Sequence, residues 1–164
     1  MRRLRELLPW FRPYRRAMAG GIAAVLGAAA FGLAAPVLVG RAIDALTAAP
    51  AFATLARYGA LVLGVAVVQG IFNYLQRKVL VTVSRKVEYD LRNAYFAHLE
   101  RLDAGFYQRH RIGDLMARSV SDLGAVRMLC GPAIMYSTHT VATAAGALAG
   151  MVWIDPKLTL VALA

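Results

Sequence analysis

Three long stretches of uncharged, mostly apolar residues alternate with polar stretches along the chain. They cover residues 17–40, 58–76 and 128–154, and are 24, 19 and 27 residues long. A helix needs roughly 20 apolar residues to cross a hydrocarbon core of about 30 Å, so each stretch is long enough to span a membrane. A fourth apolar run begins at Leu158 and stops with the chain. The pattern predicts an all-α membrane protein with three long transmembrane helices and the start of a fourth, and we expect the chain to be a fragment of a longer protein.

The second apolar stretch does not end where a membrane would end. No Gly or Pro occurs between Gln76 and Gly105, and apolar residues recur there with gaps of three or four, which is the helical period. These residues are Leu80, Val83, Val87, Leu91, Tyr95, Leu99 and Leu102. Glu88 and Arg92 form a well-oriented i,i+4 pair. A continuous helix over 58–103 would be roughly 70 Å long at 1.5 Å per residue, with about 40 Å beyond the membrane and an apolar stripe that needs partner helices.

The positive charges lie almost entirely in two parts of the chain. Of the 19 Lys and Arg residues, 16 lie in residues 1–16 and 77–127. Cytoplasmic flanks of membrane helices collect Lys and Arg, so the N-terminus and the 77–127 loop are expected in the cytoplasm, with 41–57 and 155–157 outside. Because topology explains the net charge of +10, nucleic-acid binding is not needed to explain it.

Two further patterns concern how the helices meet the membrane and each other. Residues 2–16 mix Arg with Leu and aromatic side chains, which favours a segment lying in the membrane interface. Small residues recur at every fourth position in the first and third apolar stretches, and such stripes allow close helix contacts. They are Gly20, Ala24, Ala28 and Gly32 in the first stretch, and Ala142, Gly146 and Gly150 in the third. The predicted transmembrane bounds, extensions included, are 17–43, 58–103, 119–154 and 157–164.

The polar loop at 104–118 joins the second and third long helices. We expect Gly105 to end the second helix and Gly113 to prevent the helix from continuing beyond it. Asp114 can then cap a new short helix, because its carboxylate can accept hydrogen bonds from free backbone N–H groups. The short helix would present a small apolar face with a charged rim. The face is Leu115 and Met116, and the rim is Arg111, Asp114 and Arg118.

The sequence lacks the patterns of common catalytic sites. It has no G-x-x-x-x-G-K-[ST] loop for nucleotide phosphates, and its histidines have no metal-ligand spacing. The chain alone is therefore not predicted to be an enzyme, and no metal site is predicted. Polar side chains inside the predicted spans are candidates to line a substrate path or to form ordinary bonds between helices. The candidates are Asn73, Tyr136 and His139.

Several runs of this sequence resemble a known family. The run from Glu88 to Leu102, followed by Phe106–Arg118 and Asp122, resembles the first cytoplasmic loop of ABC exporters. The Gly-Asp-Leu-Met-x-Arg core at 113–118 is its most specific part. Residues 36–44 resemble the end of the first span of that family, and 155–160 the start of the fourth. The most similar members are bacterial half-transporters of the multidrug type.

The resemblance implies a fold, a mechanism and partners. Each half would contain six long helices in the bacterial inner membrane, and two identical or different halves would pair. A nucleotide-binding domain, absent from these 164 residues, would bind ATP and Mg. A coupling helix would rest in a groove of that domain and drive export of a hydrophobic or amphipathic substrate by alternating access. Its residues would be Arg111, Ile112, Gly113, Asp114, Leu115, Met116 and Arg118.

Two other classes of function stay open at this point. One is a membrane-anchored helical scaffold or signalling module whose extension pairs with a soluble partner. The other is a secondary transporter or channel, for which His139 is the single ionisable candidate inside a span.

Overall fold

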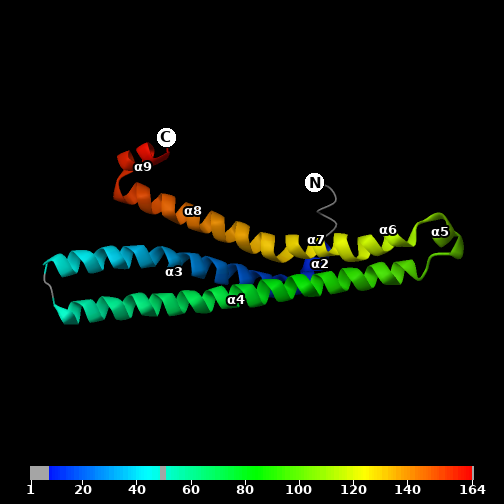
Figure 1. Cartoon of the computed structure of the whole chain (residues 1–164), viewed down its shortest axis with the longest axis horizontal. Helices are drawn as coiled ribbons and strands as arrows, with labels where there is room; N and C mark the ends of the chain where they lie inside the picture. The colour runs from blue at the N-terminus through cyan, green and yellow to red at the C-terminus, as the bar shows by residue number, and fades with distance from the viewer. Residues whose placement is uncertain (1–7, 49–50, 164) are drawn as a thin grey trace. The chain divides into compact units, whose positions relative to one another are not determined.

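The computed structural model describes residues 8–48 and 51–163. Apart from short turns, these residues are helical, and no strand occurs among them, which confirms the all-α prediction (Figure 1). The N-terminal helices are α2 (Leu8–Phe11), η1 (Arg12–Tyr14), α3 (Arg15–Ala48) and α4 (Phe52–Leu99). After α4 come α5 (Ala104–Arg109), α6 (Ile112–Ala117), η2 (Arg118–Asp122), α7 (Leu123–Met128), η3 (Leu129–Ala133), α8 (Ile134–Ile154) and α9 (Pro156–Leu163).

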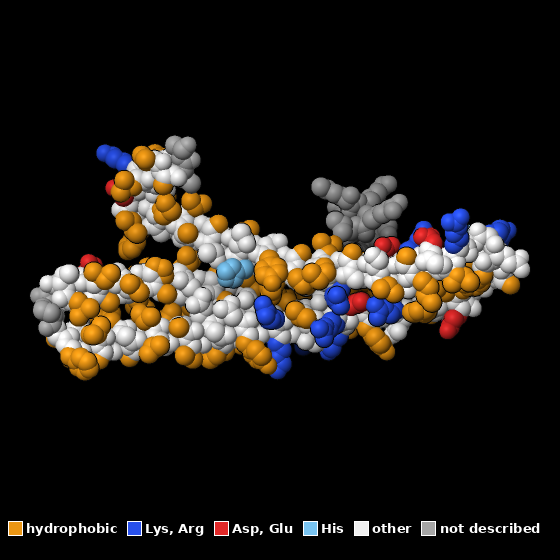
Figure 2. Space-filling model, in the orientation of Figure 1, with side chains coloured by type: hydrophobic (Ala, Val, Ile, Leu, Met, Phe, Trp, Pro, Cys, Tyr) orange, Lys and Arg blue, Asp and Glu red, His pale blue; other side chains and the backbone are white. Residues whose placement is uncertain are grey.

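The chain divides into two compact units, and α3 and α4 each contribute to both. The first comprises residues 1–21 and 77–135 and the second residues 22–76 and 136–164. The first contains 16 of the 19 Lys and Arg residues, and we call it the charged unit. We call the second the apolar unit. Figure 2 shows Lys and Arg side chains gathered over the part of α4 that belongs to the charged unit.

In the charged unit, α4 packs its periodic apolar face against neighbouring helices. Leu80, Val83 and Val87 are almost fully buried, as the sequence predicted for that stripe. Gly131 of η3 meets α4 so closely that a Cβ there would lie 2.6 Å from Ser84 Oγ and 3.3 Å from the Leu80 carbonyl oxygen. A glycine is therefore required where η3 crosses α4.

In the apolar unit, small residues of α3 bring it close to α4. Ala28 is fully buried, and a Cβ on Gly32 would lie 2.8 Å from Gln69 Nε2. Phe31 and Phe72 stack with their ring centroids 5.6 Å apart. Of the predicted small stripe, Ala24, Ala28 and Gly32 lie at helix contacts, whereas Gly20, which belongs to the charged unit, faces open space.

The helix bounds differ from the predicted ones at several ends. The loop expected over 41–57 is largely helical, since α3 runs to Ala48 and α4 begins at Phe52. The alanine-rich sequence there favours helix. The second helix ends at Leu99 rather than at Asp103, because the Leu99 carbonyl accepts from the Leu102 N–H and the Tyr107 hydroxyl.

Both ends of the chain extend beyond the described residues. Of the predicted interfacial segment 2–16, residues 8–16 are helical and residues 2–7 lie outside the described part. At the other end Asp155 separates α8 from α9, and its Oδ1 accepts hydrogen bonds from the Lys157 and Leu158 N–H groups at 2.8 and 3.2 Å. This cap starts α9, while Ala164 lies outside the described residues.

From α6 to α8 the chain is helical without interruption, but two of its turns are π-helical, η2 and η3. Pro132 lies in η3. A proline has no N–H to donate and its ring crowds the preceding turn, and the wider π turn accommodates both effects. The sequence predicted a short helix near 112–118 and a second helix over 119–154. The structure joins the two and places a π turn at Arg118–Asp122 and another at Leu129–Ala133.

Two of the described helices are long and apolar enough to cross a membrane, by length and composition alone. They are Pro9–Thr47, with 39 residues, and Phe52–Leu99, with 48 residues. Helix α8 has 21 residues, and the polar run from Tyr136 to Thr140 in its first half lowers its apolar character.

Candidate functional site

The loop between α4 and α7 folds into two short helices at the end of the charged unit. Asp103 is extended before α5, and Arg111 is extended before α6. Each extended residue lets the chain change direction without a glycine in the left-handed region. Helix α6 (Ile112–Ala117) coincides with the short helix that the sequence predicts near 112–118.

The residues that were expected to delimit this short helix are not the ones that delimit it in the structure. Gly105 lies inside α5 and Gly113 is the second residue of α6, so neither glycine ends a helix. The prediction that Asp114 caps the helix is wrong, because Arg111 is the N-cap residue and no side chain caps it. The Asp114 carboxylate instead pairs with Arg118 one turn later, at 3.0 Å on the exposed side of the helix.

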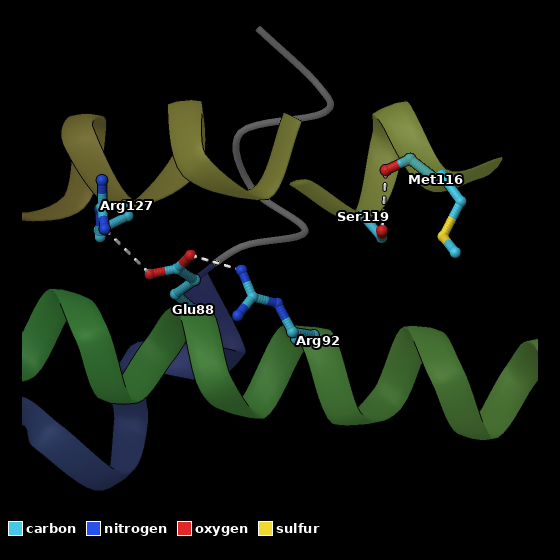
Figure 3. Close-up of polar contacts among 5 residues, drawn as sticks. All are labelled: Glu88, Arg92, Met116, Ser119 and Arg127. Atoms are coloured by element: carbon cyan, nitrogen blue, oxygen red, sulfur yellow. Dashed lines mark hydrogen bonds and ion pairs between the residues drawn. The ribbon is translucent and has the colours of Figure 1, made fainter. Parts of the chain in front are cut away.

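Two tyrosine hydroxyls fasten this loop to α4. The Tyr95 hydroxyl donates to the Leu115 carbonyl oxygen at 3.1 Å, and the Tyr107 hydroxyl donates to the Leu99 carbonyl oxygen at 2.7 Å. Just after α6, in η2, Ser119 is buried and its hydroxyl donates to the Met116 carbonyl oxygen at 2.8 Å (Figure 3). The sequence pattern placed Tyr95 in an apolar stripe and did not predict its bond to Leu115. The hydroxyl group of Tyr95 is the one feature of the sequence that could have indicated this bond.

The predicted apolar face of α6 divides in two. Leu115 is half-buried toward α4 and helps to line a cavity of about 250 Å³, whereas Met116 and Ile112 are 60% and 63% exposed. The other lining residues are Tyr95, Phe96, Leu99, Glu100, Tyr107, Ile112, Met116 and Ser119. The exposed apolar surface of α6 is thus the i,i+4 pair Ile112 and Met116 rather than Leu115 and Met116.

A carboxylate joins α4 to α7 further along the charged unit. Glu88 accepts from Arg92 at 2.8 Å, which confirms the predicted i,i+4 pair, and also lies 3.7 Å from Arg127 (Figure 3). The Glu88 side chain is 12% exposed, and a nearly buried carboxylate requires such partners. The contact with Arg127 joins residues 39 positions apart in the sequence, and no spacing rule could have found it.

The structure does not bring the three candidates for a substrate path together by hydrogen bonds among the described residues. Asn73 is exposed and its Oδ1 accepts from Gln76 Nε2 at 2.8 Å. Tyr136 is 61% exposed on α8. His139 is half-buried, with Nδ1 3.5 Å from the Thr143 hydroxyl. These partners of Asn73 and His139 lie on the same helix as the residue that they contact.

The end of the charged unit presents a surface to which another domain could attach. Among residues 8–48 and 51–163, no group of three His, Cys, Asp or Glu side chains could hold a metal ion. The loop supplies a short helix with exposed apolar side chains and an Arg-rich rim, held at the end of a long helix.

Comparison with known proteins shows to which family the chain belongs. The family model for the ABC transporter transmembrane region matches residues 18–164. The ATP-dependent lipid A-core flippase of Nitrosococcus oceani is 33% identical, over 97% of this chain and 27% of its own length. The multidrug resistance-like ATP-binding protein MdlA of Escherichia coli is 32% identical, over 82% of this chain and 23% of its own.

A third relative is the uncharacterized ABC transporter ATP-binding protein YfiC of Bacillus subtilis, which is 29% identical over 85% of this chain and 23% of its own length. The chain therefore spans about a quarter of the length of these curated relatives. The family resemblance read from the sequence is confirmed: the chain belongs to the ABC transporter transmembrane region family.

Proposed function

We propose that this chain is the membrane-spanning part of an ATP-driven exporter, and that α5 and α6 receive force from a nucleotide-binding domain. The observation that carries the proposal is the attachment of α6 to the end of a 48-residue helix with exposed Ile112 and Met116 on its surface. The names of the relatives, which include an ATP-dependent flippase and ATP-binding proteins, support it.

Helix α4 has the properties that force transmission requires. It contains no Gly or Pro from Arg77 to its end at Leu99, so it lacks the residues at which helices usually bend. The tyrosine bonds and the half-buried Leu115 tie α6 to this rod. A displacement of α6 is thereby passed to α4 instead of being absorbed at the joint, which suits a switch between two states.

The proposal includes a topology and partners. The chain forms three transmembrane helices and the start of a fourth, with the N-terminus and the extensions of the second and third helices in the cytoplasm of a bacterium. ATP and Mg bind in the nucleotide-binding domain, and a second half-transporter completes the pathway. Within it, Asn73, Tyr136 and His139 line the route of a hydrophobic or amphipathic substrate, which moves by alternating access.

The test replaces the exposed apolar pair of α6. In the full-length protein, Ile112→Asp with Met116→Asp should uncouple ATP hydrolysis from transport, because charged side chains cannot replace an apolar contact with the nucleotide-binding domain. We expect substrate-stimulated ATPase activity and transport in vesicles each to fall about tenfold or more, while membrane insertion is unchanged.

The control is Tyr89→Asp, which places one aspartate of the same kind at a 65% exposed position of α4 outside the loop, and it is compared with the single variant Met116→Asp as well as with the double variant. It should leave most of the coupled activity. If the α6 double variant retained transport and stimulated ATPase activity, the assignment of α6 as the coupling helix would be wrong.

A further inference from the structure

The N-terminal end of the charged unit carries positive charge that the proposed coupling does not use. Residues 1–16 contain six arginines and a single acid, Glu6. Of these, Arg12, Arg15 and Arg16 are described, and all three are exposed. Arg12 and Arg16 are four residues apart, a spacing at which like charges on a helix destabilise one another.

Helix α4 brings further cations to the same place. The Tyr14 hydroxyl donates to Asp90 Oδ2 at 2.9 Å, and Lys86 Nζ lies 6.0 Å from the centroid of the Tyr14 ring. Tyr14 thus fixes the N-terminal segment to α4 beside Lys86 and its exposed neighbour Arg85. We call Arg12, Arg15, Arg16, Arg85 and Lys86 the basic cluster.

The acids of α4 nearest in sequence to this cluster already have partners. Asp90 accepts from Tyr14, and Glu88 holds Arg92 and Arg127. The first turns of η1 and α3 contain no acidic residue. Arg12, Arg15 and Arg16 form no ion pair with any described residue. Within residues 8–48 and 51–163, the arginines of the cluster are therefore exposed and unpaired, and an anion from outside can approach them.

The position of the cluster indicates which anion that is. Trp10 and Phe11 are half-buried directly before it, and the uncharged stretch 17–40 begins directly after Arg16. Basic residues that stand between aromatic side chains and an apolar helix lie at the level of lipid phosphates. A soluble anion would not require this boundary position.

We propose that the basic cluster binds the phosphate groups of anionic phospholipids, and that Tyr14 is the positioning residue that holds its two parts together. This site is separate from α6. It requires the chain to lie in a membrane but does not depend on ATP coupling or on transport.

The test is lipid binding measured by native mass spectrometry. The full-length protein, purified from membranes in mild detergent, is titrated with phosphatidylglycerol or with phosphatidylcholine of the same acyl chains. We expect a several-fold preference for phosphatidylglycerol. Because one basic residue near an anionic surface changes binding about fivefold, Arg12→Gln with Arg16→Gln should remove the several-fold preference, so that the two lipids bind about equally.

Two variants separate a built site from general charge. Arg41→Gln with Arg57→Gln removes the same charge from the apolar unit and should keep the preference. Tyr14→Phe removes no charge but releases Asp90, and it should reduce binding of phosphatidylglycerol at least about twofold. The proposal is overturned if the two lipids bind equally, if the control pair lowers the preference as much, or if soluble glycerophosphate displaces the lipid. Unchanged binding by Tyr14→Phe would remove Tyr14 from the site.

Discussion

The charged and apolar units contain parts of the same two long helices, yet different interactions hold them together. All the ion pairs found among the described residues lie in the charged unit, as do the hydroxyl bonds that join Tyr95 and Tyr107 to backbone carbonyls. The apolar unit relies on small residues and on the stacked rings of Phe31 and Phe72. In the proposed topology this contrast has a physical reason, because lipid offers no hydrophobic driving force between helices and close packing must hold them there, whereas polar contacts suit the unit proposed to lie in the cytoplasm.

The largest expected effect comes from crowding the backbone contact of the charged unit. Gly131→Val places a Cβ 2.6 Å from Ser84 Oγ and 3.3 Å from the Leu80 carbonyl oxygen, and this backbone cannot move aside without shifting α4. We expect a loss of about 3 kcal/mol in stability, measured by thermal unfolding in detergent. Ser84→Ala should not rescue it, since the Ser84 Cβ is itself only 2.7 Å away.

Gly124→Val is the matched control for that substitution. Gly124 lies in α7, and a Cβ at this position would have no neighbouring atom within 4 Å, so the same change meets open space. Its unfolding temperature should stay within about 4 °C of that of the parent protein, as expected for a loss of no more than about 1 kcal/mol. Equal destabilisation by both variants would contradict the close approach of η3 to α4.

The next effect concerns the ion pairs of the charged unit. Glu88→Gln leaves Arg92 and Arg127 without their carboxylate, and we expect a loss of about 2 kcal/mol because Glu88 is nearly buried. The control is Asp114→Asn, which breaks an exposed pair that should contribute about 0–1 kcal/mol. The difference is read as unfolding free energy in urea. A greater loss from Asp114→Asn would reverse the ranking of the two pairs.

A crowding substitution in the apolar unit should reduce stability less than Gly131→Val does, and a second substitution should recover part of the loss. Gly27→Val places a Cβ 2.8 Å from the Phe72 ring, which is a side chain that can be replaced. We expect a loss of about 1–2 kcal/mol, and Phe72→Leu in the same protein should recover part of it. Thermal unfolding of the single and double variants measures this coupling. If Phe72→Leu gave no recovery, the contrast with Gly131 would fail.

The smallest effect tests the joint between α4 and α6. Tyr95→Phe removes one hydroxyl and leaves the Leu115 carbonyl without that donor, at a cost of about 1 kcal/mol. Amide hydrogen exchange in α6 should speed up about fivefold. Tyr89→Phe, at an exposed tyrosine of the same helix, should leave the exchange of α6 unchanged. If Tyr89→Phe sped up exchange in α6 as much as Tyr95→Phe does, the effect would not come from the Tyr95 bond.

Periodic features of the sequence predicted the fold well where one helix face decides the structure. The burial of Leu80, Val83 and Val87 followed from their spacing, and the Glu88–Arg92 pair followed from the i,i+4 rule. The short helix at 112–117 was also placed correctly. Its cap was not, because an extended Arg111 starts α6 without any side-chain bond, and no residue preference announces that geometry.

The contacts that sequence reasoning missed join residues far apart along the chain. Arg127 reaches Glu88 and Tyr14 reaches Asp90 across 39 and 76 positions, and both bonds depend on how helices pack rather than on local pattern. The orientation of Leu115 toward α4 depends on the same packing. Periodicity alone could not show that Ile112, and not Leu115, shares the exposed face of α6 with Met116.

The two π turns have a consequence for the phase of the helix that contains them. Each wide turn adds about one residue to the turn, so the side chains beyond it are rotated by about 100° relative to an unbroken α-helix. Beyond η2, the residues of α7 therefore face about 100° away from the direction that counting from α6 would assign. Deleting one residue from η2 would restore regular winding and turn α7 so that it presents a different side to α4.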